Sequence, residues 1–101
     1  MLRTSQVGNA FWNNRKATGN SVRSTGDKLY SYFTVLLQRL PDGKVIGNIT
    51  KYSSSTSKHQ SQCQVRFADL LVDNIPHGTN DLSAYLGEPA NIGKLKIKRR
   101  K

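Results

Sequence analysis

The sequence is poor in the residues that build disulfides, metal sites and membrane spans. Among 101 residues there is one cysteine, Cys63, so no disulfide can form within the chain. No CxxC or HxxxH spacing is present, which argues against a zinc site. The longest apolar-rich stretch, residues 30–37, is too short to cross a bilayer. We therefore expect no metal, no cofactor and no membrane partner.

Features of exported proteins are missing as well. Residues 1–9, MLRTSQVGN, contain no apolar run of the kind that a signal peptide needs. A single unpaired cysteine fits a reducing compartment. These absences predict a soluble protein of the cytoplasm.

Catalytic groups are not found in a recognisable arrangement. His59 and Cys63 are four residues apart, the spacing of a thiol–imidazole pair on a helix, but Cys63 falls on the predicted core face and no third group orients the pair. A packed cysteine is the favoured interpretation. The basic half of the chain also lacks the paired carboxylates that hold a nuclease metal. The sequence predicts a binding protein and not an enzyme.

Positive charge is in excess, and it is segregated along the chain. The net charge is +10. Residues 1–66 carry ten basic and two acidic residues, residues 67–93 carry four acidic and no basic ones, and residues 94–101, KLKIKRRK, carry six basic ones. Such segregation favours a polyanionic partner. We expect residues 94–101 to be a basic tail with salt-sensitive phosphate contacts, the alternative being a final strand through Leu95 and Ile97.

The N-terminal part predicts an arm followed by a short helix. Residues 1–8 are polar and have no periodicity, which indicates a flexible arm. Asn9 can cap a helix over residues 10–17, in which Phe11 and Trp12 are apolar anchors. A single domain would then span residues 9–93, between the arm and the tail.

The middle of the chain predicts a loop and then a β-hairpin. Residues 18–27 are rich in turn formers and predict a mobile surface loop. Two β-branched and aromatic runs, residues 28–40 and 44–52, flank Pro41-Asp42-Gly43, which is a specific hairpin signal.

Alternation along these runs predicts two different sheet faces. The expected core face carries Leu29, Phe33, Val35, Leu37, Val45 and Ile49. The opposite face carries Tyr30, Tyr32, Thr34, Gln38, Asn48 and Tyr52. The second face is either a stacking platform for nucleic acid or an ordinary half-solvated sheet face, and the sequence leaves both open.

A run of hydroxyl residues before an apolar-periodic segment predicts the main helix. Ser54 or Ser55 is the expected N-cap, and the helix would run to residue 74. Its core face would carry Thr56, Gln60, Cys63, Phe67, Leu70, Leu71 and Asn74. A second short helix is expected over residues 82–86. The predicted fold is a small α+β domain: an antiparallel β-hairpin or sheet against one main amphipathic helix, with a short N-terminal helix.

The start of the main helix has two interpretations. Ser57, Lys58 and His59 could hold a phosphate or another anion next to free backbone N–H groups. Alternatively, the serines cap the helix, Lys58 is solvated and His59 bonds at the core margin. The second interpretation is the more common one for such a segment.

Several motifs resemble a family of small bacteriophage-encoded domains of uncharacterised function. They are FWNNRKATGN, the LYSY run at residues 29–32 and the segment YSSSTSKHQ at residues 52–60, which is similar to the family's YSxTTSRHQ. Ser55 stands where the first threonine is usual, and Lys58 replaces arginine. The resemblance spans about residues 10–60. It implies a phage origin and marks YSSSTSKHQ as a functional or fold-defining set, without implying a reaction.

These observations predict a small basic phage protein that binds DNA or RNA through electrostatic and aromatic contacts in the cytoplasm of the host cell. The alternative is a protein-interaction module for host takeover or anti-defence, which binds and inhibits a host factor such as a nuclease or polymerase. The candidate nucleic-acid-binding residues are Arg15, Lys16, Arg23, Tyr30, Tyr32, Lys51, Tyr52, Ser57, Lys58, His59, Lys94, Lys96, Lys98, Arg99, Arg100 and Lys101.

Overall fold

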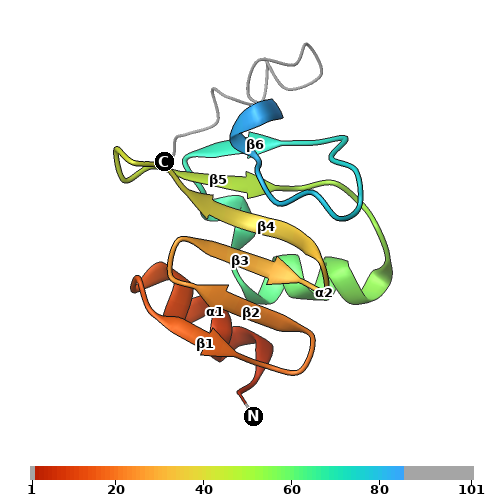
Figure 1. The fold of residues 1–101 in the computed structure, drawn as a ribbon. Coiled ribbons are helices and arrows are strands. Elements are labelled where there is room, and N and C mark those ends of the chain that lie inside the picture. The colour runs from red at the N-terminus through yellow and green to blue at the C-terminus, as the bar shows by residue number, and fades with distance from the viewer. Residues whose placement is uncertain (1, 86–101) are drawn as a thin grey trace.

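One six-stranded sheet organises the chain (Figure 1). The computed structural model describes residues 2–85, so the predicted tail, residues 94–101, lies outside the described residues. The strands are β1 (Lys16–Thr18), β2 (Val22–Thr25), β3 (Lys28–Ser31), β4 (Thr34–Arg39), β5 (Val45–Asn48) and β6 (Leu70–Val72). They lie in chain order across the sheet, and each pair is antiparallel except β5 and β6, which are parallel.

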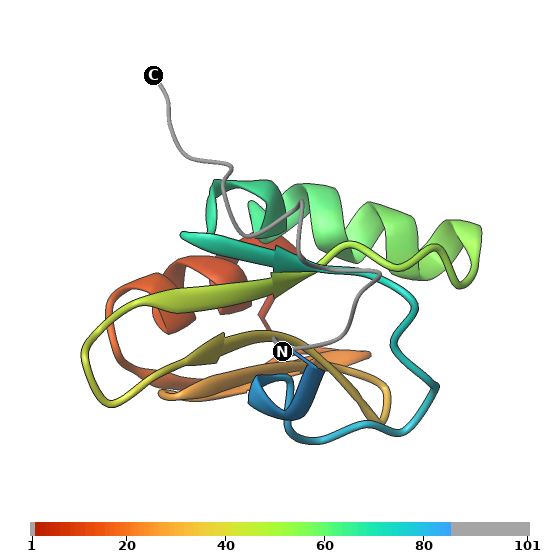
Figure 2. The same cartoon turned by 90° about the horizontal axis from the view of Figure 1, so that it is seen from above.

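Two helices cover one face of this sheet, and a short turn of helix lies on the other (Figure 2). The helical elements are α1 (Thr4–Trp12), α2 (Ser54–Gln62) and the 3₁₀ turns η1 (Val65–Phe67) and η2 (Ser83–Tyr85). None of the described helices is long and apolar enough to cross a membrane. The α+β class is confirmed, but a single main helix on a hairpin does not match the structure.

Strands β4, β5 and β6 are buried on both faces of the sheet, and the apolar residues form two clusters. The cluster beneath the helices holds Val7, Phe11, Val22, Leu29, Leu36, Leu37, Val45, Cys63, Val65, Ala68 and Leu71. The cluster on the opposite face holds Val35, Ile46, Val72, Ile75 and Leu82. The segment after β6 therefore covers part of the sheet face that the sequence leaves open as a stacking platform or a half-solvated face.

The prediction for the N-terminal helix is wrong in its position. The helix begins at Thr4 and ends at Trp12, so most of the expected flexible arm is helical. At its start the backbone N–H of Arg3 donates to Oε1 of Gln6 at 2.9 Å. Val7 and Phe11, one helical turn apart, are both fully buried, and this pair fixes the helix on the sheet. Residues 16 and 17, expected in the helix, belong to β1.

The loop predicted at residues 18–27 is also wrong, because it contains β2. Val22 and Ser24 are buried while Arg23 and Thr25 are exposed, the alternation of a half-buried strand. The Ser24 hydroxyl donates to the carbonyl of Arg15 at 2.8 Å and accepts from the N–H of Gly26 at 3.1 Å. Tertiary pairing with β1 and β3 thus orders a segment whose composition is typical of loops.

The hairpin turn at residues 41–43 is confirmed, but the first predicted strand is two strands. The chain reverses at Tyr32 and Phe33, with Tyr32 at a φ of 57°, so Phe33 is 83% exposed and not in the core. A bulge opposite Leu29 and Tyr30 then shifts the register of β4. Val35 consequently lies in the cluster opposite the helices, and not with Leu29 as predicted.

The predicted main helix is shorter than expected. It begins after Ser53, one residue before the predicted caps, and ends at Gln62. Gln64 adopts a left-handed conformation with a φ of 60°, which stops the helix. The apolar run that follows pairs with β5 as strand β6. In a strand, Leu71 and Val72 point to opposite faces of the sheet, and each is buried there.

Candidate functional site

The segment YSSSTSKHQ, residues 52–60, makes contacts that stabilise the fold, beginning with those of Tyr52. The Tyr52 hydroxyl donates to the carbonyl of Ile75 at 2.6 Å and accepts from Nδ2 of Asn48 at 3.0 Å. Burial raises the pKa of Tyr52. Its ring also lies 4.5 Å from that of His77. Tyr52 therefore joins the end of β5 to the segment after β6.

The following residues of the same segment fasten α2 to the sheet. The Ser53 hydroxyl accepts from the N–H of Thr56 at 3.2 Å, which caps the helix, and Thr56 is buried. One turn later, Nε2 of Gln60 donates to the carbonyls of Asn48 at 2.7 Å and Thr50 at 2.9 Å. The contacts of these residues support the fold-defining interpretation of the segment.

His59 is turned toward the sheet and away from the helix start. Its Nδ1 and the Ser31 hydroxyl share a hydrogen bond of 2.6 Å, and its ring lies 5.7 Å from the ring of Tyr32. Burial lowers the pKa of His59, which favours the neutral ring. Ser31 is only 2% exposed, so this hydrogen bond links α2 to β3 below the surface.

We expect His59 to make the protein less stable in mild acid. Its pKa is lowered in the folded state but has its ordinary value near 6.5 in the unfolded chain, so the unfolded chain takes up the proton first. The free energy of unfolding should fall as the pH drops below about 6.5. Urea unfolding at about pH 7.5 and about pH 5 measures this loss, and His59→Gln should reduce it.

His77 provides the matched control, because it is exposed. The same pair of measurements on His77→Gln shows how much of the loss the replacement of a different histidine removes. Asp81 does not interfere: hydrogen bonds, first that from Ser83, keep its pKa below its usual range, so it titrates at lower pH. An unchanged loss in His59→Gln would contradict the assignment.

Cys63 is packed in the core, as the sequence favours. It is 1% exposed, and its Sγ contacts the carbonyl oxygen of Thr4 at 3.6 Å. Burial raises the pKa of its thiol to about 12, so the thiol is protonated at neutral pH. In the described part of the chain, no three His, Cys, Asp or Glu side chains gather as metal ligands would.

The three candidate tyrosines do not share one open face. Tyr30 is part-buried against the second apolar cluster, with the Arg23 guanidinium 4.2 Å above its ring. Tyr52 is bonded as described above, whereas Tyr32 is 52% exposed at the β3–β4 turn. The side chain of Gln38, on the same face, is also hydrogen-bonded within the protein: its amide donates to Asp81 and accepts from the N–H of Leu82.

The candidates at the start of α2 do not converge either. Ser57 lines a pocket beside the helix, Lys58 is exposed, and His59 contacts Ser31. Successive helix residues are about 100° apart around the axis, so these three side chains point in different directions. The anion site predicted from this segment is therefore not assembled as a unit.

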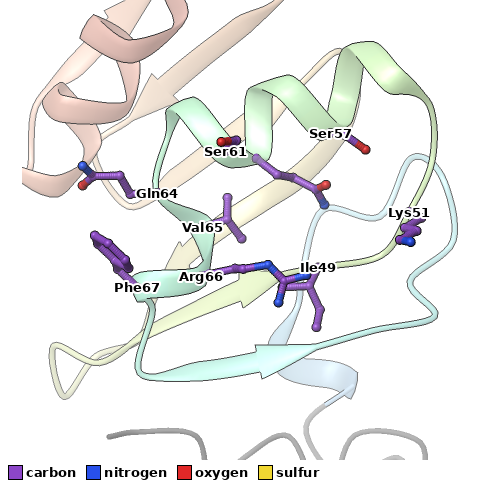
Figure 3. Close-up of a pocket in the computed structure, with 9 residues that line it drawn as sticks. Ile49, Lys51, Ser57, Ser61, Gln64, Val65, Arg66 and Phe67 are labelled. Atoms are coloured by element: carbon purple, nitrogen blue, oxygen red, sulfur yellow. The ribbon is translucent and has the colours of Figure 1, made fainter. Parts of the chain in front are cut away.

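A pocket of about 380 Å³ lies between α2, η1 and the chain that leaves β5 (Figure 3). Its described lining residues are Ile49, Lys51, Ser57, Gln60, Ser61, Gln64, Val65, Arg66 and Phe67. Two are cationic and none is acidic. In Figure 3 Arg66 extends from η1 toward Ile49, while Phe67 and Lys51 lie at opposite ends. This pocket gathers cations, hydroxyls and an aromatic ring, and it is the candidate site.

The remaining candidates lie elsewhere. Arg15 and Lys16 line a separate hollow of about 370 Å³ next to α1, together with Gln6 and Asn9. Arg23 is on β2, against Tyr30. Lys94, Lys96, Lys98, Arg99, Arg100 and Lys101 lie outside the described residues. Of the ten candidates within residues 2–85, the structure thus brings Lys51 and Ser57 into the pocket.

Arg66 and Phe67 are pocket residues that sequence reasoning missed. A helical wheel extended through residue 74 places Phe67 in the core, but the helix ends before it and Phe67 is 76% exposed. The adjacent basic and aromatic residues are a signal that could have found them.

Comparison of the chain with protein-family models, with curated proteins and with solved structures gives no match. The function is therefore inferred from the contacts and charges of the described residues and from the composition of the chain.

Proposed function

We propose that the protein binds nucleic acid and that the pocket between α2 and η1 provides phosphate contacts. The observation that carries this is that Lys51 and Arg66 line one concave surface with no acidic side chain among its described lining. Their side chains make no hydrogen bond or ion pair within residues 2–85, so both are available to an anion. Two such cations attract phosphate and orient it through charge-assisted hydrogen bonds.

The charge of the whole chain supports the same partner. A net charge of +10 on 101 residues favours a polyanion, and the run of six basic residues from Lys94 to Lys101 would add contacts that do not depend on sequence. In this proposal the pocket orients the nucleic acid and the basic C-terminal run raises the affinity.

Removing the two pocket cations should weaken binding measurably. We expect the double variant Lys51→Ala/Arg66→Ala to lose affinity about tenfold for each cation at low salt, and the slope of log K against log salt to become shallower by about one per lost phosphate contact. A mobility-shift series with DNA and RNA over a range of salt concentrations measures both quantities.

Lys44→Ala is the matched control. Lys44 is an exposed lysine in the β4–β5 turn and does not line the pocket, so its loss changes the net charge without touching the site. Its effect should be small. If the double variant binds as tightly as the parent and with the same salt slope, the pocket is not the binding site.

A second candidate function is binding of a host protein. The observation that favours it is the β3–β4 turn, where Phe33 is 83% and Tyr32 is 52% exposed. Tyr32 holds a positive φ that favours glycine, and strain of this kind is concentrated at functional positions. Failure to bind nucleic acid at low salt, together with loss of a specific host protein from pull-downs with Phe33→Ala, would support this alternative.

A further inference from the structure

Phe67 is an aromatic side chain that the fold holds in solvent. It is the last residue of η1, and its N–H donates to the carbonyl of Gln64 at 3.0 Å. Val65 and Ala68, on either side, are buried beneath α2 and anchor the turn in the core. Phe67 cannot move inward without displacing these neighbours, so its ring is presented at the surface with 76% exposure.

The lining of the pocket that includes this ring indicates the chemistry of the ligand. Arg66, the neighbour of Phe67 in η1, extends into the same pocket, Lys51 lies at the opposite end, and Ser57 and Ser61 line it one helical turn apart along α2. A ligand that fits must combine a flat apolar face with negative charge. A nucleotide has both, since its base has a π-face and its phosphate accepts from guanidinium, ammonium and hydroxyl groups.

The exposed ring of Phe67 should bind single strands and duplexes with different affinity. In a duplex the faces of the bases are covered by their neighbours in the stack, so an aromatic side chain must first unstack a base step, whereas an unpaired or terminal base offers its face at no such cost. A pocket that used charge alone would bind both forms through phosphate. Phe67 adds a contact that a single strand makes more readily than a duplex does.

We propose that this pocket binds single-stranded nucleic acid, with one base stacked on Phe67 at one end and phosphates along the strand held by Arg66 and, at the opposite end, by Lys51. This rests on the proposed function and deepens it. The inference predicts tighter binding of a single strand than of a duplex of the same sequence, and a selective loss of that difference when the ring is removed.

The test compares a fluorescently labelled single strand of about twelve nucleotides with its duplex in anisotropy titrations. Phe67→Ala should weaken single-strand binding by about 5-fold to 100-fold, the range for loss of one base stack, and leave duplex binding within about twofold. Phe67→Tyr should retain the affinity of the parent. Circular dichroism should show an unchanged fold, because the side chain is exposed.

Phe33→Ala is the matched control, because it removes an exposed phenylalanine that does not line the pocket. It should bind both forms like the parent. If Phe67→Ala binds the single strand as tightly as the parent while Lys51→Ala/Arg66→Ala is weakened, base stacking is overturned and the proposed function stands. If the parent binds neither form at low salt, both proposals fail.

Discussion

Replacement of Phe11 by alanine should destabilise the protein by about 3–5 kcal/mol and lower its melting temperature by roughly 20 °C. Phe11 is fully buried in the cluster beneath the helices and packs edge-on against Trp12, with ring centroids 5.5 Å apart. The Arg39 guanidinium lies 4.5 Å above its ring and donates to its carbonyl at 2.9 Å. The truncation therefore removes apolar contacts and leaves a cavity beside a charged group.

The two exposed phenylalanines are controls for this change. Phe33→Ala and Phe67→Ala remove the same atoms from side chains that are 83% and 76% exposed, and each should change the free energy of unfolding by less than about 0.5 kcal/mol. Chemical unfolding in urea compares the three variants. Similar losses at all three positions would contradict the burial of α1 on the sheet.

Gly47→Ala should cost about 3 kcal/mol, because β5 and η1 approach closely at this position. A Cβ at Gly47 would lie 2.5 Å from the carbonyl oxygen of Val65 and 2.9 Å from Cβ of Ala68. Gly47 pairs with Leu37 on one side and Leu71 on the other, so its strand cannot move aside. The turn η1 must shift instead, and Arg66 and Phe67 would shift with it.

Thermal unfolding and nucleic-acid affinity should therefore both change in Gly47→Ala. The comparison is Gly43→Ala, where a Cβ meets no atom within 4 Å but the φ of 93° is strained for alanine. That variant should lose about 1–2 kcal/mol from backbone strain and keep its affinity. Full stability of Gly47→Ala would show that η1 is not seated on β5 as described.

The features that local chemistry determines were predictable from the sequence. Pro41, Asp42 and Gly43 form the β4–β5 turn, and Gly43 has the positive φ that such a turn requires. The hydroxyl cluster predicted the start of α2 to within one residue, because a serine side chain can replace the missing backbone acceptor. Packing of Cys63 followed from its position on the apolar face of that helix.

Features that depend on tertiary pairing were not predictable. The turn between β3 and β4 contains Tyr32 and Phe33, with no glycine or proline to mark it. The apolar spacing of residues 63–74 fits a helix, but pairing with β5 makes part of it strand β6, and a short apolar run does not distinguish the two. The same error placed Phe67 in the predicted core. The part of the pocket that η1 provides was therefore not predicted.

The candidate site was partly predictable, because composition indicates the kind of partner but does not show which polar side chains are free to bind it. Composition indicates a polyanionic partner, and Lys51 and Ser57 are among the predicted binding residues. Tyr52, Ser53 and Gln60 have polar side chains that suit binding or structure equally, and only their hydrogen bonds show that they hold the fold.

Chemical-shift mapping tests the central claim most directly. Backbone amide signals of the ¹⁵N-labelled full chain are followed as an unlabelled single-stranded oligonucleotide is added. The account predicts that the largest changes among residues 2–85 fall on Lys51, Ser57, Ser61, Arg66 and Phe67, which line the pocket. Changes centred instead on Arg15 and Lys16 or on the β3–β4 turn, or no change at low salt, would contradict it.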